Sequence, residues 1–221
     1  MKIGDLNKDL FINSSMEELK ERWTNKEALR KSAIRRWQLH YQKITFGKKK
    51  GRLANILKLL TQLHNTFYLG YFESTCALAG NLLEQSLIFK MEQLLAIKNE
   101  IYITDDNGKR KITTKDEIYS LCFQELILAC YQNELFLEKR MAKLAHDIRK
   151  IRNHCVHAEM PLFTQNKNEY VLKISIGTQA NGKENISLPE NEIKDLTDNI
   201  EQLTPYYCVT RVRQVLGDLF S

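Results

Sequence analysis

The longest helical pattern in the chain covers residues 71–98 and is apolar around most of its circumference. Leucine, alanine, phenylalanine and methionine recur there at almost every angular position, whereas a surface helix is apolar only along one stripe. A helix of this kind has to be enclosed by other helices, so the pattern predicts a central core helix. Glu84 is the acid in the middle of this segment, and a charge in that place requires a partner.

Other segments supply the helices that would enclose it. Apolar residues at helical spacing predict amphipathic helices over 15–45, 53–70, 116–132 and 134–158. Pro189 predicts the start of a C-terminal helix, which Pro205 interrupts and which continues to about 220. Three prolines and nine glycines in 221 residues leave little room for low-complexity linkers. The predicted fold class is therefore mainly α, a helical bundle.

Two regions alternate between apolar and polar residues, as strands do. Residues 101–103 and 111–113 flank a polar turn, and residues 170–176 precede an Asn-Gly pair at 181–182 that predicts a hairpin. We expect a small C-terminal β-hairpin followed by a terminal helix. The chain then divides into a basic N-terminal helical segment (1–52), a helical core (53–160), and a hairpin plus helix packing on that core (161–221).

Positive charge is concentrated at the N-terminus. Residues 1–52 hold 14 Lys and Arg against 6 Asp and Glu, whereas the net charge of the whole chain is +6. Clusters such as Arg35-Arg36 and Lys48-Lys49-Lys50 suit the phosphates of a nucleic acid, and RNA is the partner that we predict for them. A solvated, solubilising face is the alternative interpretation.

Several classes of protein are disfavoured. The sequence has no apolar run near the roughly 20 residues of a membrane span and no signal peptide, so we expect a soluble, cytoplasmic protein without a membrane partner. Five scattered cysteines without a Cys-x-x-Cys pair predict buried free thiols and no zinc site. Without a glycine-rich phosphate loop or a carboxylate cluster, we expect no cofactor and no catalytic metal.

Residues 149–159 carry the strongest chemical signal, with Arg152, Asn153 and His157 inside six positions. Cleavage of a phosphodiester by RNA's own 2′-hydroxyl needs one group that moves a proton and another that stabilises charge on the phosphate. An imidazole near a fixed cation offers both. Ile148, Ile151 and Cys155, together with Leu144, form the apolar face that turns this helix toward the core.

Arg152 and His157 do not lie on the same face of a straight helix, because they are five residues apart. This spacing puts them about 140° apart around a straight helix. Three arrangements would let them act together. The helix ends near residues 158–161 and His157 swings round, the two reach a substrate from different sides, or two subunits combine their residues in a symmetric dimer.

Other interpretations of the same residues remain open. Arg149 and His154 repeat the five-residue spacing, although Asn153 follows Arg152 and only a lysine follows Arg149. An arginine and a histidine near a helix C-terminus also interact with the macrodipole without any catalytic role. His154 and His157 have an admissible metal-ligand spacing, but no second ligand pair accompanies them.

The sequence Arg152-Asn-His-Cys-Val-His157 resembles the Arg-polar-x3-His motif of the HEPN-domain family. Residues 71–95, with the pair Leu83-Glu84, resemble an earlier core helix of that family. The resemblance covers about 53–160 in pattern, and its specific part is six residues. It implies an all-α, HEPN-like bundle that acts as a homodimer. Many HEPN proteins are metal-independent ribonucleases of toxin–antitoxin, abortive-infection or CRISPR systems.

The resemblance also implies roles for the residues. Arg152 would bind the scissile phosphate, and His157 would be the general acid or base, giving a 2′,3′-cyclic phosphate. Asn153 would orient the phosphate or the imidazole. Glu84 would support Arg152, or the two would form a plain ion pair. Beside these roles, we predict His154 as a second supporting residue and Arg149 as an RNA-binding residue.

Two functions follow as hypotheses. The first is a HEPN-like endoribonuclease of defence, stress or toxin–antitoxin systems, with an antitoxin or regulatory protein as a further partner. The second is a non-catalytic HEPN-fold module that binds nucleic acid or a protein. The solvent exposure of Arg152 and His157 distinguishes the two hypotheses, because both side chains have to reach solvent if they are catalytic.

Overall fold

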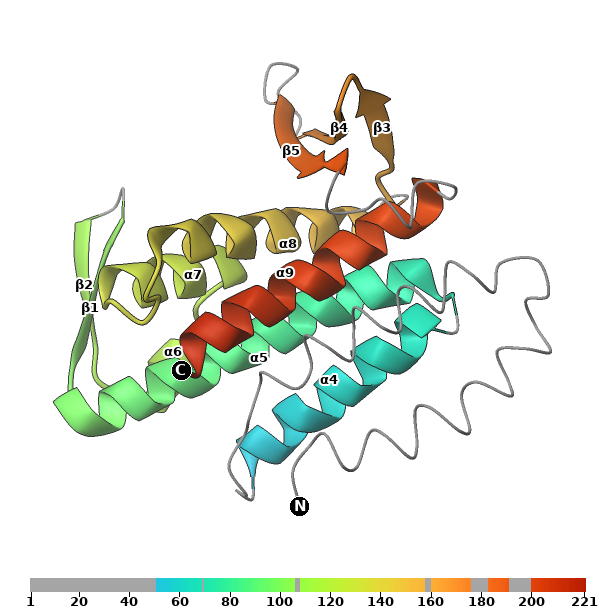
Figure 1. The fold of residues 1–221 in the computed structure, drawn as a ribbon. Coiled ribbons are helices and arrows are strands. Elements are labelled where there is room, and N and C mark those ends of the chain that lie inside the picture. Colours follow the sequence, from blue (N-terminus) through green and yellow to red (C-terminus); the bar gives the residue numbers. More distant parts are fainter. Residues whose placement is uncertain (1–50, 69, 106–107, 158–159, 176–182, 191–199) are drawn as a thin grey trace.

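Figure 1 shows a helical bundle with two small antiparallel sheets at its periphery. The computed structural model describes residues 51–221 apart from 69, 106–107, 158–159, 176–182 and 191–199. The helix predicted over 15–45, and the basic residues Arg35, Arg36 and Lys48 to Lys50, lie outside the described residues. Within the described ranges, no helix is long and apolar enough to cross a bilayer.

Helix α5 (Phe72–Lys98) is the central helix of the bundle. Helices α4 (Arg52–Tyr68), α8 (Lys139–His157) and α9 (Leu203–Leu219) all pack against it (Figure 1). Leu82 and Leu83, about 100° apart around α5, are both fully buried, as is Leu87. Burying each such side chain stabilises the fold by roughly 1.5–3 kcal/mol. The predicted central core helix is confirmed.

The predicted helix over 116–132 is wrong as a single helix, because it is two. Helix α6 (Lys115–Tyr119) begins at Thr114, whose hydroxyl accepts the Glu117 backbone N–H while the Glu117 carboxylate accepts the Thr114 N–H. Helix α7 (Phe123–Gln132) begins in the same way, since the Cys122 backbone N–H donates to the Glu125 carboxylate at 2.7 Å. Each glutamate three residues into a helix fixes a new N-terminus, and Cys122 is exposed instead of buried.

Strands β1 (Ile101–Asp105) and β2 (Gly108–Ile112) form the predicted first antiparallel pair. Helix α8 begins at Lys139, five residues later than predicted. The delay follows from Glu134, whose positive φ of 58° breaks the helical path immediately after α7.

The C-terminal sheet has three strands, so the predicted two-stranded hairpin is incomplete. Strands β3 (Phe163–Asn166), β4 (Glu169–Ser175) and β5 (Lys183–Pro189) pair antiparallel in that order. Phe163 is buried and its ring lies 5.8 Å from that of Tyr207, which fixes the sheet to α9. The predicted turn at 181–182 lies outside the described residues.

Pro189 is the last residue of β5, and residues 191–199, over which the helix predicted from Pro189 would continue, lie outside the described residues. A short 3-10 turn, η3 (Ile200–Gln202), leads into α9. Pro205 does not interrupt α9. It lies in the first turn of the helix, where a backbone N–H has no intrahelical partner to lose.

Candidate functional site

Helix α8 carries the residues that the sequence selected for chemistry. Ile148 and Ile151 are fully buried, and Leu144 and Cys155 are half-buried against the same core. This burial confirms the predicted apolar face and leaves the polar motif at the edge of the helix and on its outer side. The helix remains regular through His157.

The Arg152 side chain packs against a glycine on α5, Gly80. A Cβ atom built on Gly80 would lie 2.5 Å from Cγ and 2.7 Å from Cβ of Arg152, which is closer than any real contact. The missing side chain therefore lets the two helices approach at this point and lets the Arg152 stem lie across α5. The Arg152 side chain is 32% exposed, so its guanidinium reaches solvent.

Two polar groups orient that guanidinium. Nη1 donates to Oδ1 of Asn153 at 3.0 Å, and Nη2 lies 3.9 Å from Oε2 of Glu84. Glu84 lies one turn beyond Gly80 on α5 and is 25% exposed. A long, partly solvated ion pair is worth no more than about 1 kcal/mol. Its effect is thus to orient Arg152 more than to stabilise the fold.

His157 is the last residue of α8 and is exposed. Because the helix stays regular up to this position, His157 lies about 140° around the axis from Arg152. Helix α8 ends at His157, and residues 158–159 lie outside the described residues. All three arrangements therefore stay open: a swing of His157 at the helix end, a substrate reached from two sides, and a site shared by two subunits.

The neighbouring pair of Arg149 and His154 differs from Arg152 and His157 mainly in its histidine, because His157 is exposed. Arg149 and His154 are both half-buried, and burial lowers the pKa of Arg149. His154 and His157 lie one turn apart, and the part of the chain that the structure describes holds no group of three or more His, Cys, Asp or Glu side chains suited to a metal.

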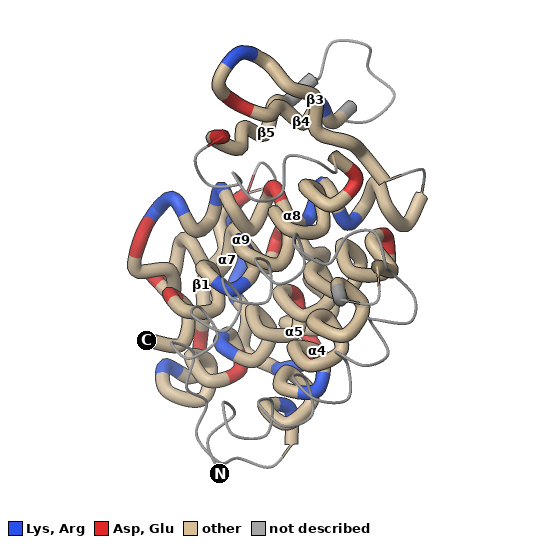
Figure 2. The backbone as a smooth tube through the Cα atoms, turned by 45° about the vertical axis from the view of Figure 1, so that its right-hand side comes forward, with Lys and Arg blue, Asp and Glu red and all other residues tan. Residues whose placement is uncertain are grey.

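Helix α8 is strongly basic, a feature that the regional charge count missed. It holds six Lys and Arg residues and a single acid, Asp147, and Figure 2 shows Lys and Arg along it and on the β1–β2 hairpin. Residues 53–158 hold 13 Lys and Arg against 12 Asp and Glu, so acids elsewhere in this range, several of them in α5, α6 and α7, offset the charge of α8. Burial, and then the charges of Arg149 and Lys150, lower the pKa of His146 to about 4, so this imidazole is neutral at pH 7.

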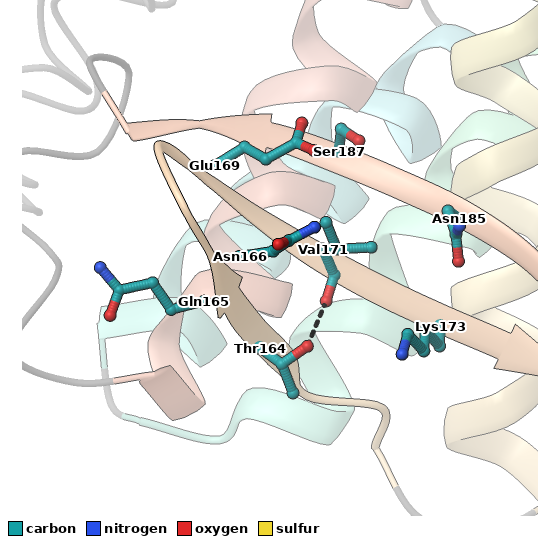
Figure 3. Close-up of a pocket in the computed structure, with 8 residues that line it drawn as sticks. All are labelled: Thr164, Gln165, Asn166, Glu169, Val171, Lys173, Asn185 and Ser187. Atoms are coloured by element: carbon teal, nitrogen blue, oxygen red, sulfur yellow. Dashed lines mark hydrogen bonds between the residues drawn. The ribbon is translucent and has the colours of Figure 1, made fainter.

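A separate depression of about 500 Å³ lies on the C-terminal sheet (Figure 3). Its lining is polar but nearly uncharged, with Lys173 and Glu169 as its charged members. The Thr164 hydroxyl donates to the Val171 carbonyl at 3.1 Å and so ties β3 to β4 inside it. The depression contains none of the predicted site residues, and its balanced charge gives it no preference for a phosphate.

Gly80 is the site residue that the sequence reasoning missed. A glycine in the interior of a long helix is a signal of close packing, but only the register of α5 against α8 shows that Arg152 is the partner. Comparisons with protein-family models, with curated proteins and with solved structures gave no match. The function therefore has to be argued from these residues alone.

Proposed function

We propose that this chain is a HEPN-like, metal-independent endoribonuclease that acts in the cytoplasm in defence, stress or toxin–antitoxin biology. The observation that carries the proposal is the setting of Arg152. Gly80 accommodates the stem of Arg152, and Glu84 and Asn153 contact its guanidinium at the edge of α8. His157 is exposed five residues further along the same helix.

In the proposed reaction, Arg152 binds a non-bridging oxygen of the scissile phosphate and stabilises the charge that develops there. His157 takes the proton from the adjacent 2′-hydroxyl or gives one to the departing 5′-oxygen. The 2′-oxygen forms a bond to phosphorus as the 5′-oxygen leaves, which yields a 2′,3′-cyclic phosphate and a 5′-hydroxyl. Asn153 keeps the guanidinium in place through its amide oxygen.

A homodimer would resolve the angle between the two residues. In a two-fold pair, Arg152 of one subunit would face His157 of the other, and both copies of the shared site would be equivalent. Lys143 and Lys150 of α8 would supply positive charge along the RNA path.

The first experiment incubates purified protein with total RNA in EDTA. Arg152→Ala and His157→Ala should each lower the cleavage rate by about 100-fold or more, with cyclic phosphate ends on the wild-type products. Arg140→Ala is the matched control, because it removes an exposed arginine from the other end of the same helix. Circular dichroism checks that each variant is folded.

The alternative pair is tested in the same assay. If Arg149→Ala and His154→Ala abolish cleavage while Arg152→Ala and His157→Ala do not, the assignment moves to that pair. Cleavage that stops in EDTA would contradict a metal-independent mechanism.

Subunit mixing tests the shared site. A dimer formed from one Arg152→Ala and one His157→Ala subunit would contain one dead site and one intact site. Randomly mixed inactive variants should therefore regain about one quarter of wild-type activity. Mixtures that stay inactive, although sedimentation shows that subunits exchange, would place both residues in a single chain.

A second candidate is a non-catalytic HEPN-fold module that binds nucleic acid or a protein partner such as an antitoxin. The contact between Arg152 and Glu84 favours it, because an arginine engaged by an acid can serve structure alone. This candidate predicts no cleavage and RNA binding that weakens when Lys143 and Lys150 of α8 are replaced by alanine.

A further inference from the structure

Three of the cysteines, Cys76, Cys155 and Cys208, form a cluster where helices α5, α8 and α9 meet. Burial raises the pKa of the Cys76 thiol, and the neighbouring thiols of Cys155 and Cys208 raise it further. The three helices pack against one another in pairs, so the cluster connects elements that are far apart in the chain. This arrangement is unrelated to the predicted chemistry of Arg152 and His157.

The close approach at Gly80 explains why two of these thiols meet. Helices α5 and α8 run antiparallel, and Gly80 contacts the stem of Arg152. Cys76 lies one turn before Gly80 and Cys155 lies one turn after Arg152. In antiparallel helices both cysteines are therefore one turn along the helix–helix interface from the contact of Gly80 with Arg152. A disulfide requires Cα atoms within about 7 Å, and helices that approach at a glycine are closer than usual.

The three thiols differ in access to solvent. Cys76 and Cys208 are fully buried, whereas Cys155 is half-buried. A small oxidant in solution therefore reaches Cys155 first. The hydrogen bond from the Cys76 thiol also lowers the pKa of Cys155, which favours the reactive thiolate, while burial raises the pKa of Cys76 well above its usual range.

We propose that Cys155 and Cys76 are a redox-active pair that forms a disulfide between α8 and α5 when the protein meets a hydroperoxide. The Cys155 thiolate attacks one peroxide oxygen, the O–O bond breaks, and Cys155 becomes a sulfenic acid while hydroxide leaves. The Cys76 sulfur then displaces the hydroxyl from Cys155. Its proton leaves with that hydroxyl as water, and the S–S bond closes.

The disulfide would link α8 to α5 covalently, one helical turn from Arg152. Cys208 would keep its thiol, because it is buried and is not the site of first oxidation. The disulfide would form whether or not the protein cleaves RNA, and mass spectrometry detects it directly.

Peptide mapping tests the pair directly. The protein, in a Cys122→Ser background that removes the exposed thiol, is treated with stoichiometric hydrogen peroxide, alkylated and digested with trypsin. Cys76, Cys155 and Cys208 fall on separate peptides, 59–90, 153–167 and 195–211. We expect a crosslink between 59–90 and 153–167, with Cys208 alkylated.

A second variant and a second measurement complete the test. Cys155→Ser should abolish the crosslink, and oxidation of the background protein should raise its unfolding midpoint by roughly 5–15 °C, reversibly with a thiol reductant. A crosslink between 59–90 and 195–211 would overturn the assignment. So would a Cys155 that becomes sulfinic acid, or stays reduced, while Cys76 remains alkylated.

Discussion

Replacing Gly80 by alanine is the most direct test of the contact between α5 and α8. The new Cβ would lie 2.5 Å and 2.7 Å from the first two side-chain carbons of Arg152. Those atoms are at the fixed end of the side chain, so the helices have to separate. Overpacking of this kind destabilises by about 1–3 kcal/mol, whereas alanine in place of glycine improves helix propensity by about 1 kcal/mol. We expect a net loss of about 1 kcal/mol.

Gly217→Ala is the matched control for this prediction. Gly217 lies inside α9, and a Cβ there would meet nothing within 4 Å. This variant should gain up to about 1 kcal/mol from helix propensity alone. The changes in unfolding free energy of the two variants should differ by about 1–3 kcal/mol. This difference measures the cost of overpacking against Arg152, because the gain in helix propensity is common to both variants.

The assay is urea unfolding followed by circular dichroism, with thermal midpoints as a second reading. A loss of 1 kcal/mol lowers the midpoint by about 2–4 °C in a chain of this size. In an Arg152→Gly background both colliding carbons are gone, so Gly80→Ala should become as favourable as Gly217→Ala. If Gly80→Ala stabilises the otherwise wild-type protein as much as Gly217→Ala does, the close approach and the role given to Gly80 are refuted.

Three further predictions concern stability. The pKa of His146 is lowered to about 4 in the folded state, so the unfolded state binds a proton more readily. The free energy of unfolding should therefore fall by about 1–2 kcal/mol, after allowance for partial exposure, as pH drops from 6.5 toward 4. In urea titrations at several pH values, His146→Gln should make this free energy less dependent on pH. Burial raises the pKa of Asp147, whose stabilising contribution is therefore lost as pH rises, so Asp147→Asn, which can still accept the Tyr207 hydroxyl, should be more stable at pH 7 by about 1 kcal/mol. A destabilised variant at pH 7 would contradict this reasoning. Thr114→Ala should cost about 1 kcal/mol through loss of the cap that pairs with Glu117, and an unchanged urea midpoint would show that α6 does not need it.

The sequence predicted most of the long helices because their patterns are strong. The segment 71–98 had to be central, since no other place in a bundle buries apolar residues on every side. The break between α6 and α7 was missed because Leu121 and Cys122 continue the apolar pattern. Glu117 and Glu125 were the available signals, as glutamates three residues after a helix start.

Strand β3 was missed for a different reason. Four residues with one buried side chain, Phe163, give almost no alternation, and pairing with β4 decides their conformation. Pro205 was taken as a helix breaker because the sequence does not show how far from the helix start it lies. The same residue is harmless in a first turn.

For the candidate site, the sequence selected Arg152, Asn153, His157 and Glu84 but could not set their distances. The proximity of Glu84 and Arg152 depends on the register of two helices about 70 residues apart in the chain. The same register brings Gly80 against Arg152 and Cys76 against Cys155. Contacts across helices require tertiary structure, and local patterns do not encode them.

The central position of α5 has a consequence for how the chain acquires its fold. Helix α4 lies next to α5 in sequence, but α9, which covers another side of α5, follows about a hundred residues later. Such distant contacts raise the contact order and slow folding. Until α9 packs against α5, leucines of α5 remain exposed to solvent and can associate with other unfolded chains. We expect an early intermediate with α4 and α5 formed that is prone to aggregation and is a natural client for chaperones.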